Sequence, residues 1–129
     1  MLFKSFIIIL LIILLVFLLL SYLFPLVQII GDSMFPTYFD EEIVIGTRLY
    51  SKSRLKVGDV VVYKTTDRIV VKRIAEIDTQ GNIMLLYCLG DNAEVSYDSR
   101  HYGYISSKQL ICKLINPRPN RRKRGVSND

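Results

Sequence analysis

The chain has 129 residues, half of which are hydrophobic, and its formal net charge at pH 7 is +5. This length allows one domain of ordinary size and excludes a large doubly wound sheet or a barrel of eight β/α units. Because His101 is the single histidine, every Ser-His-Asp, Cys-His or two-histidine zinc site would depend on that residue.

The N-terminal segment is strongly apolar. Fifteen consecutive apolar residues run from Phe6 to Leu20. A helix over residues 6–26 would be about 31 Å long, enough to cross a hydrocarbon core of roughly 30 Å. A cleavable signal peptide usually has a shorter apolar core and a small-x-small cleavage site, which does not follow this run. We therefore predict a short cytoplasmic N-terminus (residues 1–5) and an uncleaved membrane anchor (residues 6–26).

The charges that flank this anchor predict its orientation. Lys4 and the terminal amine precede it, and four acidic residues follow it: Asp32, Asp40, Glu41 and Glu42. Basic residues favour the cytoplasmic side of a membrane. We therefore predict a single-pass membrane protein whose body lies on the extracytoplasmic side.

The body, residues 27–115, has the pattern of a compact antiparallel β domain, so the predicted fold class is mainly β. Short segments rich in β-branched residues alternate with turn signals, and no amphipathic helix separates them. The predicted strands are Glu42–Thr47, Asp59–Lys64, Arg68–Ile77 and Ile83–Leu89, with weaker patterns at Tyr102–Ile105 and Leu110–Ile115.

The positive charge lies in the C-terminal tail and not in the body. Residues 118–129 contain five basic residues and one acidic residue, whereas residues 27–117 contain 11 of each sign. A nucleic-acid-binding domain usually carries a basic stripe with interleaved aromatic residues, and the body shows none. We predict a disordered basic tail over residues 116–129, the lipid membrane as a partner, and no nucleic-acid partner.

A candidate nucleophile follows the anchor directly, in the sequence Gly-Asp-Ser-Met-Phe-Pro-Thr at residues 31–37. Between a glycine turn and a proline, the hydroxyl of Ser33 can be exposed beside backbone N–H groups that would stabilise an oxyanion. On its own, this pattern also fits an ordinary loop that leaves the membrane. A nucleophilic serine needs a base, for which the sequence offers lysines and His101.

Lys72 is the lysine whose surroundings suit a base. Strand alternation places Val70, Lys72 and Ile74 on one face. Apolar neighbours remove water from the amine, which lowers its pKa from about 10.4 toward the range of roughly 7–8 that general-base catalysis needs. By periodicity alone, a lysine that reaches solvent from an edge strand is the more common interpretation.

A third segment, residues 90–103, combines turn-forming residues, hydroxyls and a closely spaced Asp/Arg pair. As structure, it is a polar loop with a local ion pair. As part of a site, it would supply a hydroxyl to orient the lysine amine and a pair of charges to fix the loop.

Together these segments resemble the type I signal peptidase family. The resemblance rests on Ser-Met-x-Pro-Thr after an anchor, Gly-Asp-Val-Val-Val-Tyr, a Lys-Arg strand and Gly-Asp-Asn-x-x-x-Ser-x-Asp-Ser-Arg-x-x-Gly, and it extends to about Ile115. That family comprises membrane-anchored serine proteases with a Ser/Lys dyad, which remove signal peptides from exported preproteins. The resemblance implies a β domain of the signal peptidase catalytic-core type, at residues 27–115.

The resemblance also implies roles for individual residues. Ser33 would be the nucleophile and its backbone N–H an oxyanion donor, Lys72 would be the general base, and Ser96 would orient the lysine amine. Supporting residues would be Asp98 with Arg100, which form a bracing pair, and Asp91 in the same loop. The substrate would bind as an extended strand with small residues at −1 and −3, and the reaction would need no cofactor and no metal ion.

The sequence departs from the family pattern in ways that bear on substrate range. Gly31 stands where some members carry a hydroxyl residue that assists the oxyanion hole, and the second β domain of larger members is missing, which predicts a minimal catalytic core. A dedicated maturation protease with one or few substrates therefore stays open. So does a non-catalytic, membrane-tethered β module that binds peptides. Cys88 and Cys112 lack metal-binding spacing, and either a disulfide or two free cysteines fit the sequence.

Overall fold

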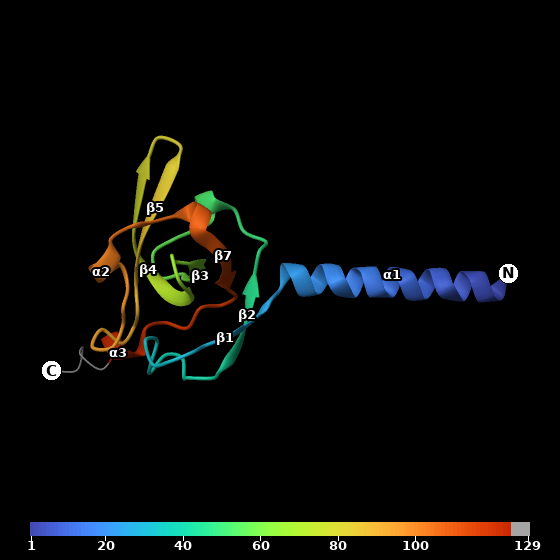
Figure 1. Cartoon of the computed structure of the whole chain (residues 1–129), viewed down its shortest axis with the longest axis horizontal. Helices are drawn as coiled ribbons and strands as arrows, with labels where there is room; N and C mark the ends of the chain where they lie inside the picture. The colour runs from blue at the N-terminus through green and yellow to red at the C-terminus, as the bar shows by residue number, and fades with distance from the viewer. Residues whose placement is uncertain (125–129) are drawn as a thin grey trace.

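The structure, a computed structural model, describes residues 1–124. Its first element, helix α1 (Leu2–Leu23), projects away from the body (Figure 1). The helix has no buried residue, and its most apolar window has a mean hydropathy of 3.4, so by length and composition it can cross a membrane. The hydroxyl of Ser21 donates to the carbonyl of Phe17 and is thus satisfied within the helix. Pro25 disfavours a helical conformation at the residue before it, and the helix accordingly ends at Leu23.

The body is a seven-stranded sheet in which every neighbouring pair is antiparallel, so the prediction of a mainly β fold is confirmed. The strand order is β1-β2-β7-β3-β4-β5-β6. The strands are β1 (Leu26–Gln28), β2 (Ile43–Thr47), β3 (Val60–Lys64), β4 (Ile69–Gln80), β5 (Ile83–Leu89), β6 (Ile105–Ser106) and β7 (Leu110–Leu114).

Short elements in the C-terminal half of the body differ from the predicted strands. Where a strand over Tyr102–Ile105 was expected, the chain forms helix α2 (Ser99–Tyr102) and then the two-residue strand β6. Asp98 caps this helix, because its carboxylate accepts from the Arg100 N–H. Gly103, with φ of +78°, ends it. The 3₁₀ turns η1 (Lys52–Arg54) and η2 (Ser107–Gln109) complete the body.

Two apolar clusters cover the two faces of the central strand β3. Val60 and Val62 point into one cluster, with Met34 and Tyr38, whereas Val61 and Tyr63 point into the other. Because both faces are buried, β3 reads as an unbroken apolar run.

The two cysteines are buried and free. Cys112 belongs to the cluster that contains Met34, and Cys88 belongs to the cluster on the opposite face of the sheet. The disulfide that the sequence left open is therefore absent.

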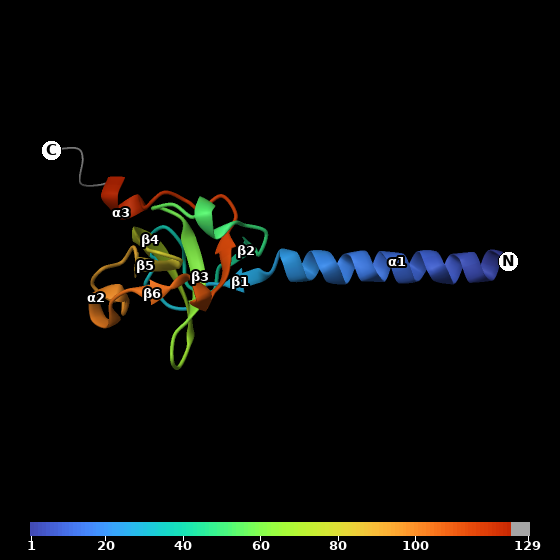
Figure 2. The ribbon, with the colours of Figure 1, turned by 90° about the horizontal axis from the view of Figure 1, so that it is seen from above.

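The C-terminal segment corrects the expectation of a disordered tail from residue 116. Residues 117–122, here called the C-terminal strap, lie against the body, and the last two belong to the short helix α3 (Arg121–Arg124). Figure 2 shows this segment on the side of the body opposite the β3–β4 hairpin. The rest of the predicted tail, residues 125–129, lies outside the described residues.

Candidate active site

Ser33 lies in a tight loop between β1 and β2. Gly31 enters this loop with φ of +82°, a conformation that favours glycine, and its N–H donates to the Asp40 carboxylate at 2.7 Å. After the serine, the buried side chain of Met34 anchors the loop in the core. The loop thus holds Ser33 half-buried at the edge of a cleft.

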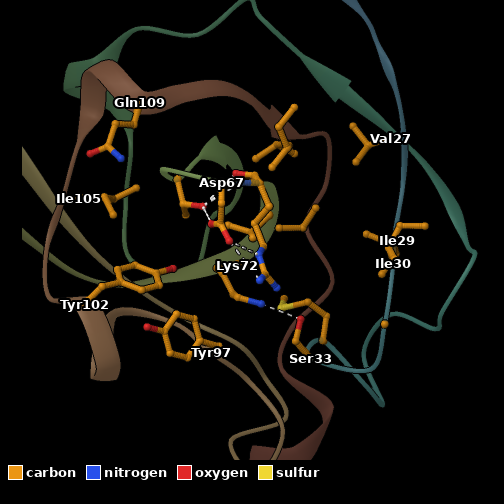
Figure 3. A pocket seen from close by; sticks show the side chains of 18 of the residues that line it. Val27, Ile29, Ile30, Ser33, Asp67, Lys72, Tyr97, Tyr102, Ile105 and Gln109 are labelled. Carbon is orange, nitrogen blue, oxygen red and sulfur yellow. Dashed lines mark hydrogen bonds and ion pairs between the residues drawn. The ribbon is translucent and has the colours of Figure 1, made fainter.

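The Lys72 amine points at Ser33. Nζ of Lys72 lies 2.7 Å from Oγ of Ser33, although the two residues are 39 positions apart in sequence (Figure 3). Lys72 comes from β4, opposite Val61 of β3, and it is only 4% exposed. The structure therefore excludes a lysine that extends into solvent and brings together the two residues that the sequence proposed as nucleophile and base.

Burial controls the protonation of this amine. Loss of hydration lowers the pKa of Lys72 from its ordinary value of 10.5 to about 8, and the positive charges of Arg100 and Arg68 act in the same direction. The Asp98 carboxylate opposes the shift but does not cancel it. A neutral amine is therefore accessible at mildly alkaline pH, as a general base requires.

Asp98 is the fully buried centre of a hydrogen-bond network. Its carboxylate accepts from the Gly90 N–H at 2.8 Å and from Arg100 in a two-pronged pair, at 3.0 Å and 2.6 Å. Burial by itself would raise the pKa of Asp98, but the hydrogen bonds from Arg100, Ser96 and the backbone outweigh it and hold the pKa well below its usual range. The Asp98–Arg100 ion pair expected from the sequence is thus present.

Ser96 makes a different contact from the expected one. Its hydroxyl donates to Oδ2 of Asp98 at 2.6 Å, whereas the expected hydrogen bond to the Lys72 amine is absent among residues 1–124. Ser96 therefore reaches the lysine only indirectly, through the charge of Asp98.

Two residues that the sequence did not single out connect this loop to the nucleophile. Arg73 forms a two-pronged pair with Asp91, at 2.9 Å and 2.8 Å. Asn92 donates its backbone N–H to the Ser33 carbonyl and its side-chain amide to the Asp32 carbonyl, at 2.8 Å and 3.0 Å. Arg73 lies next to Lys72 and Asn92 lies next to Asp91, so each was adjacent to a residue that the sequence did single out. That adjacency did not predict the distant residues to which Arg73 and Asn92 are bonded.

A cleft of about 1110 Å³ runs past the Ser33–Lys72 pair. One wall is the chain from Val27 to Met34, and the other includes residues 65–72 (Figure 3). Residues 69–72 of β4 pair with β3 on one side, and β5 pairs with β4 only from Arg73 onward. Within the described part of the chain, the remaining backbone edge of residues 69–72 therefore faces the cleft without a strand partner.

The backbone at Ser33 offers a donor to the same space. Among residues 1–124, the Ser33 N–H has no hydrogen-bond partner, and Ser33 lines the cleft. A free N–H beside a nucleophilic hydroxyl is the kind of donor that stabilises an oxyanion. The described residues contain no group of three or more His, Cys, Asp or Glu side chains that is arranged to hold a metal ion.

Comparison with protein families identifies the chain. The model of the family described as "Signal peptidase, peptidase S26" matches residues 2–81, more than half of the 129 residues. The chain belongs to this signal peptidase family. No curated protein matches the chain significantly. The signal peptidase match includes Ser33 and Lys72 but ends before the loop that holds Ser96 and Asp98.

Membership and structure together establish the general character of the molecule. As a signal peptidase, it is a peptidase that acts on preproteins at a membrane. Its single apolar helix in the described residues, α1, makes it a single-pass membrane protein.

Proposed function

We propose that this signal peptidase is a serine endopeptidase with a Ser33/Lys72 dyad, which cleaves N-terminal signal peptides from exported preproteins at the membrane surface. The observation that carries the proposal is the buried Lys72 amine 2.7 Å from the Ser33 hydroxyl. A serine with a base at this distance is the usual signature of nucleophilic catalysis.

In the proposed reaction, the neutral Lys72 amine takes the proton of Ser33 as Oγ attacks the carbonyl carbon of the scissile peptide bond. The oxyanion that forms accepts a hydrogen bond from the Ser33 N–H. The protonated Lys72 then gives its proton to the leaving amine, which releases the mature protein and leaves the signal peptide as an ester on Ser33. Lys72 next takes a proton from a water molecule as the water oxygen attacks the ester carbonyl. The bond to Oγ of Ser33 then breaks, Lys72 returns its proton to Oγ, and the signal peptide leaves with a free carboxyl group.

The loop around Asp98 has a supporting role in this proposal. Arg100 and Ser96 keep the Asp98 carboxylate ionised, and its negative charge partly offsets the effect of burial on the Lys72 amine. Asp91, paired with Arg73, fixes the adjacent part of the loop. These residues act through Ser33 and Lys72 and do not react themselves.

The substrate is proposed to bind as an extended strand in the cleft, with small side chains at −1 and −3. The free backbone edge of residues 69–72 supports this mode, because a peptide can add to an open edge through main-chain hydrogen bonds. Lys72 belongs to the same stretch of β4, so a peptide bound there would pass beside the dyad.

We place the catalytic domain on the extracytoplasmic side. Lys4 precedes the anchor and four acidic residues follow it within the loop and start of the body, as the preference of basic residues for the cytoplasmic side requires. Protease added outside intact cells should therefore cut the body, and a body that stays intact would contradict this orientation.

The function is tested with the purified full-length protein in detergent and several unrelated preproteins. We expect cleavage after the signal peptide, identified by the N-terminal sequence of the product, and loss of cleavage in Ser33→Ala. Ser53→Ala is the matched control, because Ser53 is exposed on η1, and it should cleave like the wild type. Processing of one preprotein alone would favour a dedicated maturation protease, whereas peptide binding without cleavage would favour a non-catalytic module.

A further inference from the structure

The C-terminal strap makes its main contacts through Arg118. The guanidinium group donates to the Thr37 carbonyl at 3.1 Å, forms an ion pair with Glu42 and lies 4.8 Å from the centre of the Tyr38 ring. The hydrogen bond from Arg118 lowers the pKa of Glu42, so the carboxylate is ionised at neutral pH and the ion pair is present. One side chain thus contacts residues 37, 38 and 42 of the segment that follows the nucleophile.

The backbone of Arg118 takes part as well. Its N–H donates to the Tyr38 hydroxyl at 2.9 Å, and its carbonyl accepts from Nη2 of Arg73 at 2.7 Å. Three residues further along, at the start of α3, the N–H of Arg121 donates to the Thr37 hydroxyl at 3.2 Å. The strap is therefore bonded to the body at several points around residues 37 and 38.

Residues 37 and 38 are rigidly connected to Ser33. The N–H groups of Thr37 and Tyr38 both donate to the Met34 carbonyl, at 3.0 Å and 2.9 Å, and both side chains are buried, with exposures of 0% and 2%. Residues 34–38 therefore form one compact turn that begins directly after the nucleophile. A shift of this turn moves Ser33 with it.

A second series of hydrogen bonds connects the strap to the other side of the nucleophile. Arg73 bonds to the Arg118 carbonyl and at the same time holds Asp91 in a pair that is almost fully buried. The next residue, Asn92, donates to the Ser33 carbonyl. Both series of contacts that reach Ser33 thus start at Arg118. Together they hold the nucleophile loop between the strap and the loop after β5.

We propose that Arg118 is a positioning residue, which holds the turn at residues 34–38 and the Asp91 loop so that Ser33 stays within reach of Lys72. This inference rests on the proposed function of the dyad. It assigns a role to a segment that the sequence marks only as basic and rich in proline. Since a displacement of about 1 Å costs up to roughly 100-fold in rate, a contact remote from the cleft is sufficient to control catalysis.

The test compares Arg118→Ala with Arg54→Ala in the full-length protein. Arg54 is an exposed arginine on η1, and its replacement should leave the rate unchanged. For Arg118→Ala we expect kcat to fall about 10- to 100-fold with less than about a twofold change in KM, because Arg118 does not line the cleft. Single-turnover rates at saturating enzyme should fall by the same factor, which a merely unfolded fraction of the sample would not cause.

Two conservative variants separate the contributions of Arg118. Arg118→Lys keeps a positive charge near Glu42 but lacks the planar fork that also reaches the Thr37 carbonyl, so its kcat should be intermediate. Tyr38→Phe keeps the ring but removes the acceptor for the Arg118 N–H, and kcat should again fall with KM nearly unchanged.

The outcomes are distinct. An active wild type whose Arg118→Ala variant keeps its single-turnover rate within a factor of two would overturn this inference and leave the dyad standing. A lowered rate that is fully explained by a larger KM would overturn it too. An inactive wild type would overturn the proposed function, and this inference with it.

Discussion

Replacing Lys72 with methionine is expected to lower kcat/KM by about 10²- to 10⁴-fold, the usual contribution of a general base. Methionine matches the length of the lysine side chain and suits the buried site, so the fold should persist. The variant should also be more stable at pH 7, by about 1–3 kcal/mol, since the wild type holds a desolvated ammonium group at that pH. Preprotein cleavage and thermal unfolding measure the two effects.

The matched control for this variant is Lys64→Met. Lys64 is exposed at the end of β3, and its replacement should change neither the rate nor the stability by much. A Lys72→Met variant that cleaves at the rate of Lys64→Met would show that Lys72 is not the base.

The pH dependence of the wild type belongs to the same prediction. Because the base must be neutral, kcat/KM should rise with pH, pass its midpoint near the Lys72 pKa of about 8 and level off above it. Stability follows the same group, since the folded pKa lies below the ordinary value of 10.5. The burial cost of the ammonium is fully present below about pH 8, and stability should increase as pH rises from there toward the unfolded pKa.

The second large effect is expected from Gly90→Ala. A Cβ atom at Gly90 would lie 2.6 Å from the Ser33 carbonyl oxygen and would overlap the side chain of Ser96. Neither neighbour can move freely, because the Ser33 carbonyl accepts from Asn92 and the Ser96 hydroxyl donates to Asp98. We expect about 1–3 kcal/mol of destabilisation and at least roughly a 100-fold loss of kcat, since the loop must separate from the nucleophile.

Gly81→Ala is the control for this substitution. Gly81 has φ of +62° in the β4–β5 turn, and an added Cβ would meet no atom within 4 Å. The variant should lose about 1 kcal/mol of stability through backbone strain and keep its catalytic rate. Equal rates for Gly90→Ala and the wild type would mean that the close approach of the two loops has no part in catalysis.

These predictions differ in how far the sequence alone supports them. The alternation of β4 predicted that Lys72 shares a face with apolar residues, and the family resemblance implied its pairing with Ser33. The distance between them depends on the loop after β1 and on the partners of β4, which are long-range features. Sequence pattern and the family resemblance therefore indicated the two proposed catalytic residues but not the contact between them.

Local pairs were easier to predict than distant ones. Asp98 and Arg100 are two positions apart, and a short capped helix holds them together, so their ion pair was readable from spacing. The expected hydrogen bond between Ser96 and the Lys72 amine is replaced by one to Asp98, because that carboxylate is two positions away and a charged acceptor.

The sequence did not predict the strap, because its composition indicates disorder whereas its contacts in the folded chain hold it against the body. A basic segment with two prolines is typical of disorder, yet Arg118 meets an acidic partner and an aromatic ring about 80 residues earlier in the chain. Only the folded chain brings Arg118 to Glu42 and Tyr38. The Arg73–Asp91 pair was not predicted for a similar reason, because it joins the middle of β4 to the loop after β5.

The most direct test of the dyad is to trap the acyl-enzyme. The full-length protein is mixed with a preprotein, quenched with acid during turnover, digested and analysed by mass spectrometry, with Ser33→Ala treated in parallel. We expect a signal-peptide ester on Ser33 in the wild type and no such adduct in the variant. An adduct on a different residue, or full cleavage by Ser33→Ala, would contradict it.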